Sequence, residues 1–302
     1  MILQASSYSF IIPAEKTEMK VAQKLVTGYF RAKLQLLSVF SARQAARAAF
    51  DLFCTPLKRA GRVAPPVFEK GEPLKFQLGE NQVVGHRWNA GGKRKLLIVH
   101  GFQSCSGNFS QYITALTGKG YEVLAFDAPA HGMSGGRRIN LPLYIAMLDH
   151  IHKAYGPVDD FLAHSYGCVA VSHFLETIPH DASTKAVFIA PATETTSTVD
   201  SFFTYLRLND HVRKEFDQVI YELGGHWPAH FSVRRALQHS RANVLWFHDE
   251  DDDLTPVEDA LRARADNLPN VSFHITRGLG HRRIYRDSGI MQEVIDFFEE
   301  GR

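Results

Sequence analysis

The stretch Ala163-His164-Ser165-Tyr166-Gly167 decides the fold because of the segments on either side of it. Residues 158–162 before it are typical of a short strand, and residues 168–175 after it are typical of a buried helix. A sharp turn from strand to helix strains the serine backbone, so the residues two before and two after it must be small, as Ala163 and Gly167 are. Such a turn is a nucleophile elbow, which exposes the serine hydroxyl for attack.

Two polar loops follow apolar runs further along the chain. Residues 244–248 form a β-rich apolar run that breaks into the acidic loop 249–253, and the strand-like run 271–276 gives way to Gly280-His281. Open α/β sheets place their sites just beyond the carboxyl ends of the strands. We therefore expect an acid and a base at the same sheet edge as the serine, in the chain order Ser, Asp, His.

From about residue 73 to residue 298, these motifs resemble the α/β-hydrolase superfamily. Two more motifs support the resemblance, since His100-Gly101-Phe102 follows an apolar strand and the loop 127–134 is similar to the superfamily's Asp-x-Pro-Gly-His-Gly-x-Ser. Four separate motifs in the family's order are hard to obtain by chance. The chain departs from the usual pattern where a glycine is replaced by Ala130, Ala163 or Asp249.

The resemblance implies a catalytic triad and an oxyanion hole. Ser165 is the implied nucleophile, Asp252 the implied acid and His281 the implied base. The implied oxyanion hole consists of the backbone N–H groups of Phe102 and Tyr166, and removing one such donor typically costs about 3–4 kcal/mol of barrier lowering. The activity implied by the resemblance is cleavage of a carboxylic ester or thioester through an acyl-enzyme intermediate, without a cofactor.

Alternating strand and helix signals from residue 73 onward predict an α/β fold. We expect a mostly parallel, eight-stranded sheet flanked by helices, with a small helical cap and an N-terminal helical extension. The first two strands are polar and alternating, which favours an antiparallel hairpin at the sheet edge. The predicted strands are 73–79, 82–89, 96–100, 121–126, 158–164, 185–190, 243–248 and 271–276. The predicted helices lie near 108–118, 140–155, 166–178, 256–267 and 288–300.

The chain divides into two predicted parts, an N-terminal extension over residues 1–62 and a catalytic domain over residues 63–302. The segment after the sixth strand is too long for a simple connection, so we predict a cap insertion at about 192–241. Its aromatic residues either anchor the cap to the body or line an apolar substrate pocket. An arginine that follows the implied base would instead favour an anionic substrate. The candidate pocket residues are Gln103, Phe202, Phe203, Tyr205 and Arg283.

The N-terminal extension is strongly basic. Residues 20–62 contain nine Lys and Arg residues against the single acid Asp51, a net charge of about +8, although the whole chain carries only +2. Apolar residues recur there at roughly helical spacing. Such a helix either packs on the catalytic domain or lies on an anionic membrane surface, and the sequence leaves both interpretations open. Charges interrupt every apolar run, so no membrane-spanning segment is predicted.

Other signals narrow the class of protein. Three cysteines without metal-ligand spacing and the lack of a secretory pattern favour a cytoplasmic location, with Met19 as an alternative start. Asp249, Asp251 and Asp253 alternate as in a calcium loop but lack its glycine and its distal glutamate, so no metal site is predicted. Nothing in the sequence predicts a phosphate-binding glycine loop or a nucleic-acid module.

Two other functions stay open. Some proteins with this fold bind ligands without catalysis, so a receptor-like protein is the first alternative. The second is a lipid esterase at the membrane periphery, attached through residues 20–62. In the main interpretation the expected partner is a small, ester-like substrate, and the sequence carries no signal of oligomeric state.

Overall fold

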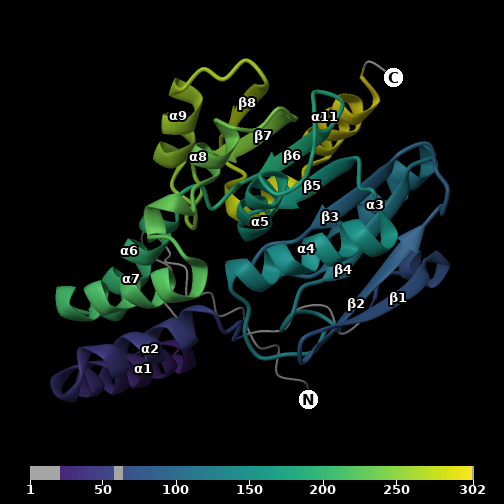
Figure 1. Cartoon of the computed structure of the whole chain (residues 1–302). Coiled ribbons are helices and arrows are strands. Elements are labelled where there is room, and N and C mark those ends of the chain that lie inside the picture. Colours follow the sequence, from purple (N-terminus) through teal and green to yellow (C-terminus); the bar gives the residue numbers. More distant parts are fainter. Residues whose placement is uncertain (1–20, 58–63, 301–302) are drawn as a thin grey trace.

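A central sheet organises the molecule. The structure, a computed structural model, describes residues 21–57 and 64–300, so the predictions about Met19 and the residues before it lie outside the described residues. The eight strands follow the order β1-β2-β4-β3-β5-β6-β7-β8 (Figure 1). Their bounds are β1 (Glu72–Leu78), β2 (Asn81–Trp88), β3 (Lys95–Val99), β4 (Glu122–Asp127), β5 (Asp160–His164), β6 (Lys185–Ile189), β7 (Asn243–Asp249) and β8 (Val271–Thr276).

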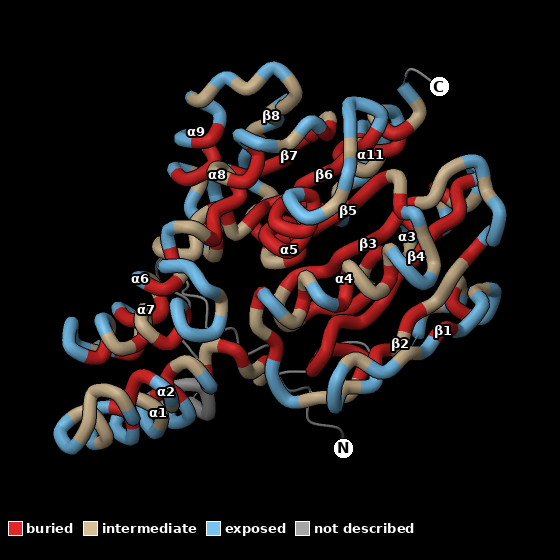
Figure 2. Tube along the Cα trace, in the orientation of Figure 1, coloured by how far each residue is buried: buried red, intermediate tan, exposed pale blue. Residues whose placement is uncertain are grey.

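The sheet is mostly parallel. Strands β4, β3, β5, β6, β7 and β8 pair in parallel, whereas β1 pairs with β2, and β2 with β4, in antiparallel fashion. The hairpin predicted at the sheet edge is therefore present. Strands β3 to β7 are buried almost throughout, while β1 and β8 alternate between buried or half-buried and exposed positions (Figure 2). The sheet and its flanking helices confirm the predicted fold class.

Two hydrophobic cores lie on opposite faces of this sheet. Neighbouring residues of β3 show the division, since Leu96 and Ile98 belong to one core and Leu97 and Val99 to the other. The core of Leu96 is completed by α3 (Ser110–Gly118) and α11 (Ser288–Glu299). The core of Leu97 is completed by α4 (Leu141–Tyr155), α5 (Tyr166–Leu175), α8 (Val233–Leu237) and α9 (Val257–Ala265).

Helix boundaries differ from the predicted ones by a few residues, for local reasons. Helix α4 begins after Asn140, because the Asn140 side chain is its N-cap and accepts a hydrogen bond from the N–H of Leu143 at 2.9 Å. Helix α5 ends three residues early. There the N–H and the hydroxyl of Thr177 both donate to the carbonyl of Phe174, at 2.9 and 2.7 Å, and close the last turn.

The segment between β6 and β7 carries three α-helices, α8 and two others. Helix α8 packs on α5 of the body, whereas the other two, which we call the α6–α7 pair, project beyond the sheet (Figure 1). The predicted cap at 192–241 thus contains two helices outside the body and one that belongs to it. The bounds of the α6–α7 pair are Thr195–Leu206 and Asp210–Gly224.

The N-terminal extension forms α1 (Val21–Phe40) and α2 (Ala42–Phe53), which lie beside the α6–α7 pair (Figure 1). The hydroxyls of Thr27 and Tyr205 share a hydrogen bond of 2.8 Å, and Arg31 donates to the carbonyl of Tyr205 at 2.8 Å. The ring of Phe53 packs edge-on against Phe202, with centroids 5.1 Å apart. The extension therefore packs on its own chain, chiefly on the α6–α7 pair.

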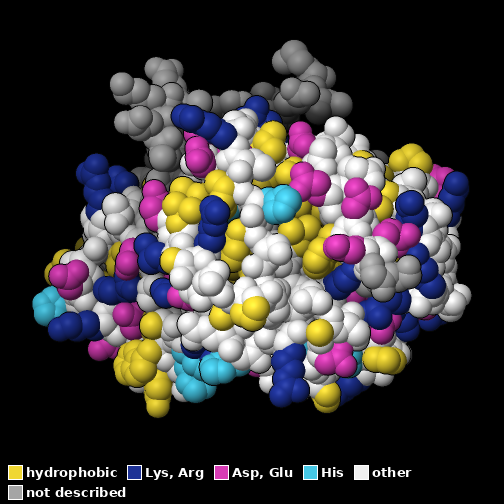
Figure 3. Space-filling model, turned by 90° about the horizontal axis from the view of Figure 1, so that it is seen from above, with side chains coloured by type: hydrophobic (Ala, Val, Ile, Leu, Met, Phe, Trp, Pro, Cys, Tyr) yellow, Lys and Arg dark blue, Asp and Glu magenta, His cyan; other side chains and the backbone are white. Residues whose placement is uncertain are grey.

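The side of α1 that faces away from the α6–α7 pair is apolar. Four large side chains there are 62–79% exposed and share one helix face: Leu25, Tyr29, Leu36 and Phe40. Elsewhere the extension's positive charge is partly neutralised, since Arg43 forms ion pairs with Glu215 and Glu222 of α7. On the face drawn in Figure 3, Lys and Arg side chains alternate with Asp and Glu. No helix in the described ranges combines the length and the apolar character needed to cross a membrane.

Candidate active site

Ser165 occupies a strained turn between β5 and α5. Its φ is +55° and its ψ is −119°, a conformation that costs on the order of 1–3 kcal/mol for a residue other than glycine. The turn also brings backbones very close together. A Cβ on Gly167 would lie 2.4 Å from the carbonyl oxygen of Val99, and a Cβ on Gly101 would lie 2.9 Å from the Cβ of Ser165. The backbone geometry expected of a nucleophile elbow is therefore present.

Three side chains from different loops form a hydrogen-bonded chain at this turn. The Oγ of Ser165 lies 3.0 Å from Nε2 of His281, and Nδ1 of His281 lies 2.8 Å from Oδ2 of Asp252. Ser165 and His281 are only 4% and 6% exposed, and the Asp252 side chain is fully buried. The three side chains proposed from the sequence as nucleophile, base and acid thus lie in direct contact.

The carboxylate of Asp252 is held in its charged form by its surroundings. Burial opposes ionisation, but the hydrogen bond and the charge of His281, together with the N–H of Thr255 at 2.8 Å, outweigh it and lower the Asp252 pKa from 3.8 to about 2. The hydroxyl of Thr255 donates a further hydrogen bond of 2.8 Å to Asp252. Asp252 is therefore an anion at neutral pH that accepts the Nδ1–H of His281, which leaves Nε2 free to accept the serine proton.

This lowered pKa predicts a pH-dependent contribution to stability. Between pH 4 and pH 2 the unfolded chain binds a proton at Asp252 that the folded chain does not, so acid destabilises the fold. We expect the advantage of the wild type over Asp252→Asn, in free energy of unfolding by urea, to shrink by on the order of 1.5 kcal/mol between pH 5 and pH 2.5. A constant difference between the two proteins across this range would contradict the prediction.

A second buried carboxylate, Asp249, holds the loop that carries His281. It accepts hydrogen bonds from the N–H groups of Leu279 and Gly280, at 3.0 and 2.9 Å, and from the hydroxyl of Thr276 at 2.7 Å. Burial raises the Asp249 pKa, but these hydrogen bonds prevail and lower it. The sequence motif shows Asp249 only as a residue that replaces a glycine. Its hydrogen-bond partners lie about thirty residues further along the chain, so no local pattern indicates that it holds this loop.

Two further histidines support the site. His164 donates from Nε2 to the carbonyl of His281 at 3.0 Å, and burial holds its pKa well below the usual range, so it is neutral. His100 accepts the N–H of Ala128 at Nε2, 2.9 Å away, and its own carbonyl accepts the hydroxyl of Tyr144 at 2.7 Å. His164 is the last residue of β5 and His100 directly follows β3, so both histidines fix backbone groups from the ends of strands at the site.

The loop after β3 is fixed from the opposite side. Gln103 has a φ of +55° and donates its N–H to Nε2 of His131 at 2.9 Å. The preceding residue, Phe102, packs its ring edge-on against Tyr166, with centroids 6.2 Å apart. Phe102, Tyr166 and Ser165 line the same cavity, so the structure brings both predicted oxyanion residues to the serine.

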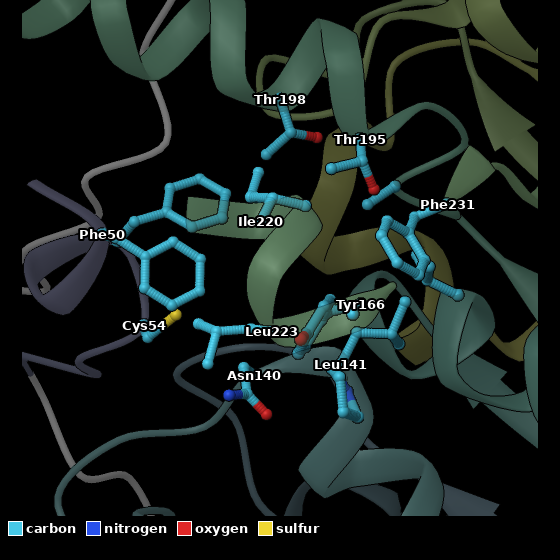
Figure 4. Close-up of a pocket in the computed structure, with 15 residues that line it drawn as sticks. Phe50, Cys54, Asn140, Leu141, Tyr166, Thr195, Thr198, Ile220, Leu223 and Phe231 are labelled. Carbon is cyan, nitrogen blue, oxygen red and sulfur yellow. The ribbon is translucent and has the colours of Figure 1, made fainter. Parts of the chain in front are cut away.

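Two adjoining cavities open at this site. The near chamber has an empty volume of about 720 Å³ and is lined by Ser165, Phe102 and Phe202, among others. The far chamber, of about 660 Å³, is lined by Phe50, Leu223 and others (Figure 4). The chambers share walls formed by Phe53, Cys54, Tyr166, Ala192 and Thr198.

Of the five candidate pocket residues, only Phe202 lines a chamber. Phe203 and Tyr205 sit on other faces of α6, where Phe203 packs on Phe216 with centroids 5.1 Å apart and Tyr205 bonds to α1. Arg283 folds back onto its own loop and donates to the carbonyls of Gly278 and Leu279. Gln103 turns its backbone toward His131 and lies outside both linings. The expectation of an arginine in this pocket is therefore corrected.

The sequence analysis missed the part of the wall that comes from the N-terminal extension. Leu52, Phe53, Cys54 and Thr55 line the near chamber, and Phe50 lines the far chamber. The signal available was the helical spacing of apolar residues in the basic extension. That spacing predicts a buried helix face but does not say which surface the face meets.

The acidic loop that carries Asp251 and Asp252 is ordered by hydrogen bonds to backbone. Within residues 21–57 and 64–300, no group of three or more His, Cys, Asp or Glu side chains is arranged to hold a metal ion. The carboxylates of the acidic loop are engaged by backbone, since Asp251 accepts the N–H of Gly278 at 3.1 Å and Asp252 accepts that of Leu254 at 2.8 Å. These bonds order the loop around His281.

The chain is similar to known hydrolases. Residues 92–225 match the sequence model of a family described as serine aminopeptidase, S33. Among solved structures, an esterase of Pyrococcus furiosus is 18% identical with a TM-score of 0.61, and the alignment covers 82% of this chain and 97% of that one. A putative lipase of Acinetobacter baumannii is 16% identical with a TM-score of 0.60, over 78% of this chain and 93% of that one. No curated protein matches the chain significantly.

At these identities the neighbours share a fold with the chain, and the resemblance predicted from the motifs is confirmed. A third neighbour, an esterase of a Rhodococcus species, agrees with a TM-score of 0.55 and 17% identity, over 76% of this chain and 99% of that one.

Proposed function

We propose that this chain, which has the α/β-hydrolase fold, is a serine hydrolase that cleaves a carboxylic ester or thioester of a small molecule. The observation that carries the proposal is the buried chain of hydrogen bonds from Ser165 through His281 to Asp252, at 3.0 and 2.8 Å. A nucleophile, a base and an orienting carboxylate in this geometry can activate a hydroxyl that is otherwise unreactive at neutral pH.

In the proposed reaction, Ser165 Oγ attacks the carbonyl carbon while His281 Nε2 takes its proton. Asp252 holds the imidazole through Nδ1 and stabilises the imidazolium that forms. The imidazolium then gives its proton to the leaving alcohol or thiol, and the acyl group stays on Ser165. Water, deprotonated by His281, attacks the acyl-enzyme and releases the acid, which returns the serine to its starting state.

The developing negative charge needs donors near Ser165. We assign this role to the backbone N–H groups of Phe102 and Tyr166, which come from the loop after β3 and from the first residue of α5. Both residues line the near chamber beside the serine. The N-terminus of α5 adds a favourable dipole for an anion at this position. Preorganised donors of this kind require no reorganisation at the moment of reaction.

The alternatives are weaker on the same observations. A receptor-like protein has no need for a serine in a strained turn bonded to a histidine–carboxylate pair. A lipid esterase at a membrane is favoured by one feature, the exposed apolar side of α1 with Leu25 and Phe40. Co-sedimentation with anionic liposomes tests that alternative. The three cysteines are buried free thiols, which suits the proposed cytoplasmic location.

Labelling with a fluorophosphonate probe tests the proposal. We expect the native chain to be labelled and Ser165→Ala to be unlabelled, because only an activated serine reacts with the phosphorus centre. Ser272→Ala, at an exposed position on β8, is the matched control and should label like the wild type. Labelling of Ser165→Ala at the wild-type level, or none of a folded wild type, would refute the proposed mechanism.

A further inference from the structure

The end of the N-terminal extension forms a wall of the pocket next to Ser165. Phe53 and Cys54 belong to both chambers, and Figure 4 shows Cys54 and Phe50 on the side of the far chamber facing Leu223. This wall comes from a segment more than a hundred residues away from the serine in sequence. It therefore belongs to the pocket through tertiary packing alone.

Contacts on two sides hold this wall in place. Toward α6 and α7, Phe53 packs on Phe202 and Phe216, with centroids 5.1 and 5.7 Å apart. Toward the body, the carbonyl of Cys54 accepts the N–H of Ile139 at 2.9 Å, and Asp51 forms an ion pair with Arg138. The wall bridges the α6–α7 pair and the loop before α4, so it closes the space between them.

Neither chamber is lined by a charged side chain. Burial raises the pKa of the Cys54 thiol to about 12, so the sulfur that borders both chambers is neutral. Two of the polar residues that line the chambers already have hydrogen-bond partners within the chain. The Thr198 hydroxyl donates to the carbonyl of Glu194, and the Asn140 side chain caps α4. A charged ligand group would lose its hydration here without gaining a partner.

The wall lies outside the part of the chain that matches the family model. The esterase of Pyrococcus furiosus is matched over 97% of its length, while about a fifth of this chain has no counterpart in it. The family match begins only at residue 92. The pocket wall supplied by α2 is therefore not part of the family match.

We propose that α2 and the turn after it complete the substrate pocket and select uncharged esters with an apolar acyl chain. This inference rests on the proposed function for its chemistry. The ester carbonyl sits in the near chamber at Ser165, and the acyl chain passes Cys54 and Tyr166 into the far chamber. Each methylene that reaches the apolar wall raises kcat/KM by about threefold to fourfold, until the far chamber is filled.

Two filling substitutions test the path of the acyl chain. Cys54→Met adds bulk where the chambers meet, and Leu223→Trp adds bulk in the far chamber. For both variants we expect the ratio of kcat/KM for p-nitrophenyl octanoate to that for the acetate to fall by about tenfold or more. Leu261→Trp, at a comparably exposed leucine on α9, should keep the wild-type ratio. Cys54→Ala should not lower it, because the smaller side chain widens the passage.

A binding measurement separates this inference from the catalytic proposal. Calorimetry with octanamide and Ser165→Ala requires no hydrolysis, and we expect binding that Cys54→Met, in the same background, weakens by about tenfold. Suberic acid monoamide, the same chain with a terminal carboxylate, should bind at least about tenfold more weakly. If the protein hydrolyses no ester but octanamide follows this pattern, the catalytic proposal fails and the pocket assignment stands.

Two results would overturn the assignment. One is octanamide binding that Cys54→Met leaves unchanged in a protein with wild-type thermal unfolding. The other is an octanoate-to-acetate ratio that both filling variants leave at the wild-type value while ester hydrolysis itself is intact.

Discussion

Replacing His281 with alanine is expected to lower kcat for p-nitrophenyl acetate by about 10⁵- to 10⁶-fold. Among the residues that the structure describes, His281 is the one base hydrogen-bonded to the Ser165 hydroxyl, with Nε2 at 3.0 Å. Without a base the hydroxyl attacks as a neutral alcohol, and only binding and the oxyanion donors still act. Steady-state rates of the wild type and of His281→Ala, each corrected by subtracting the rate of Ser165→Ala, give the size of the loss.

A histidine outside the site provides the control for this experiment. His274 lies on β8, where it is about half exposed and pairs with Glu293 at 2.6 Å. His274→Ala removes the same side chain and should keep kcat within about twofold of the wild type, since most surface substitutions change little. If the kcat of His281→Ala stayed within tenfold of the wild-type value, His281 would not be the base.

Asp252→Asn is expected to lower kcat by about 10⁴-fold while the protein stays folded. The amide can keep the contact with Nδ1 of His281 by donating its own N–H, and Nδ1 then has to be the acceptor. The histidine would then carry its proton on Nε2, where it cannot accept the proton of Ser165.

Two neighbouring carboxylates distinguish this role from a general effect of charge. Asp253 is exposed and one residue away, so Asp253→Asn removes the same charge and should keep nearly the wild-type rate. Asp249 holds the backbone at Leu279 and Gly280, so Asp249→Asn should chiefly lower the stability of the loop. A 10⁴-fold loss in Asp249→Asn together with none in Asp252→Asn would transfer the acid role to Asp249.

The elements that local patterns determine could be predicted from the sequence. The strained turn at Ser165 needs small neighbours, and the polar loops at Asp252 and His281 follow strands whose ends meet at one sheet edge. Parallel pairing of β5, β6, β7 and β8 then brings those loops together. The resemblance to the α/β-hydrolase superfamily identified the three side chains, and the sheet geometry explains why they meet.

The pocket could not be predicted in the same way, because its walls depend on which helix faces meet. Phe202 and Phe203 are adjacent in sequence, yet about 100° of helix rotation separates them and only Phe202 reaches a chamber. Arg283 lies two residues after the base in sequence, but its side chain donates to acceptors in its own loop. Likewise, the apolar spacing of the extension indicates a buried face without indicating that the face meets α6 and α7.

The docking of the N-terminal helices on the α6–α7 pair has a consequence for biosynthesis. The hydrogen bonds between Thr27 or Arg31 and Tyr205 join residues 178 and 174 positions apart. At translation rates of about 5–20 residues per second, α1 and α2 leave the ribosome roughly 10–35 s before their partners exist. Throughout that interval the inner faces of these helices are as exposed as the outer side of α1. Chaperone demand should therefore concentrate on the first helices to emerge.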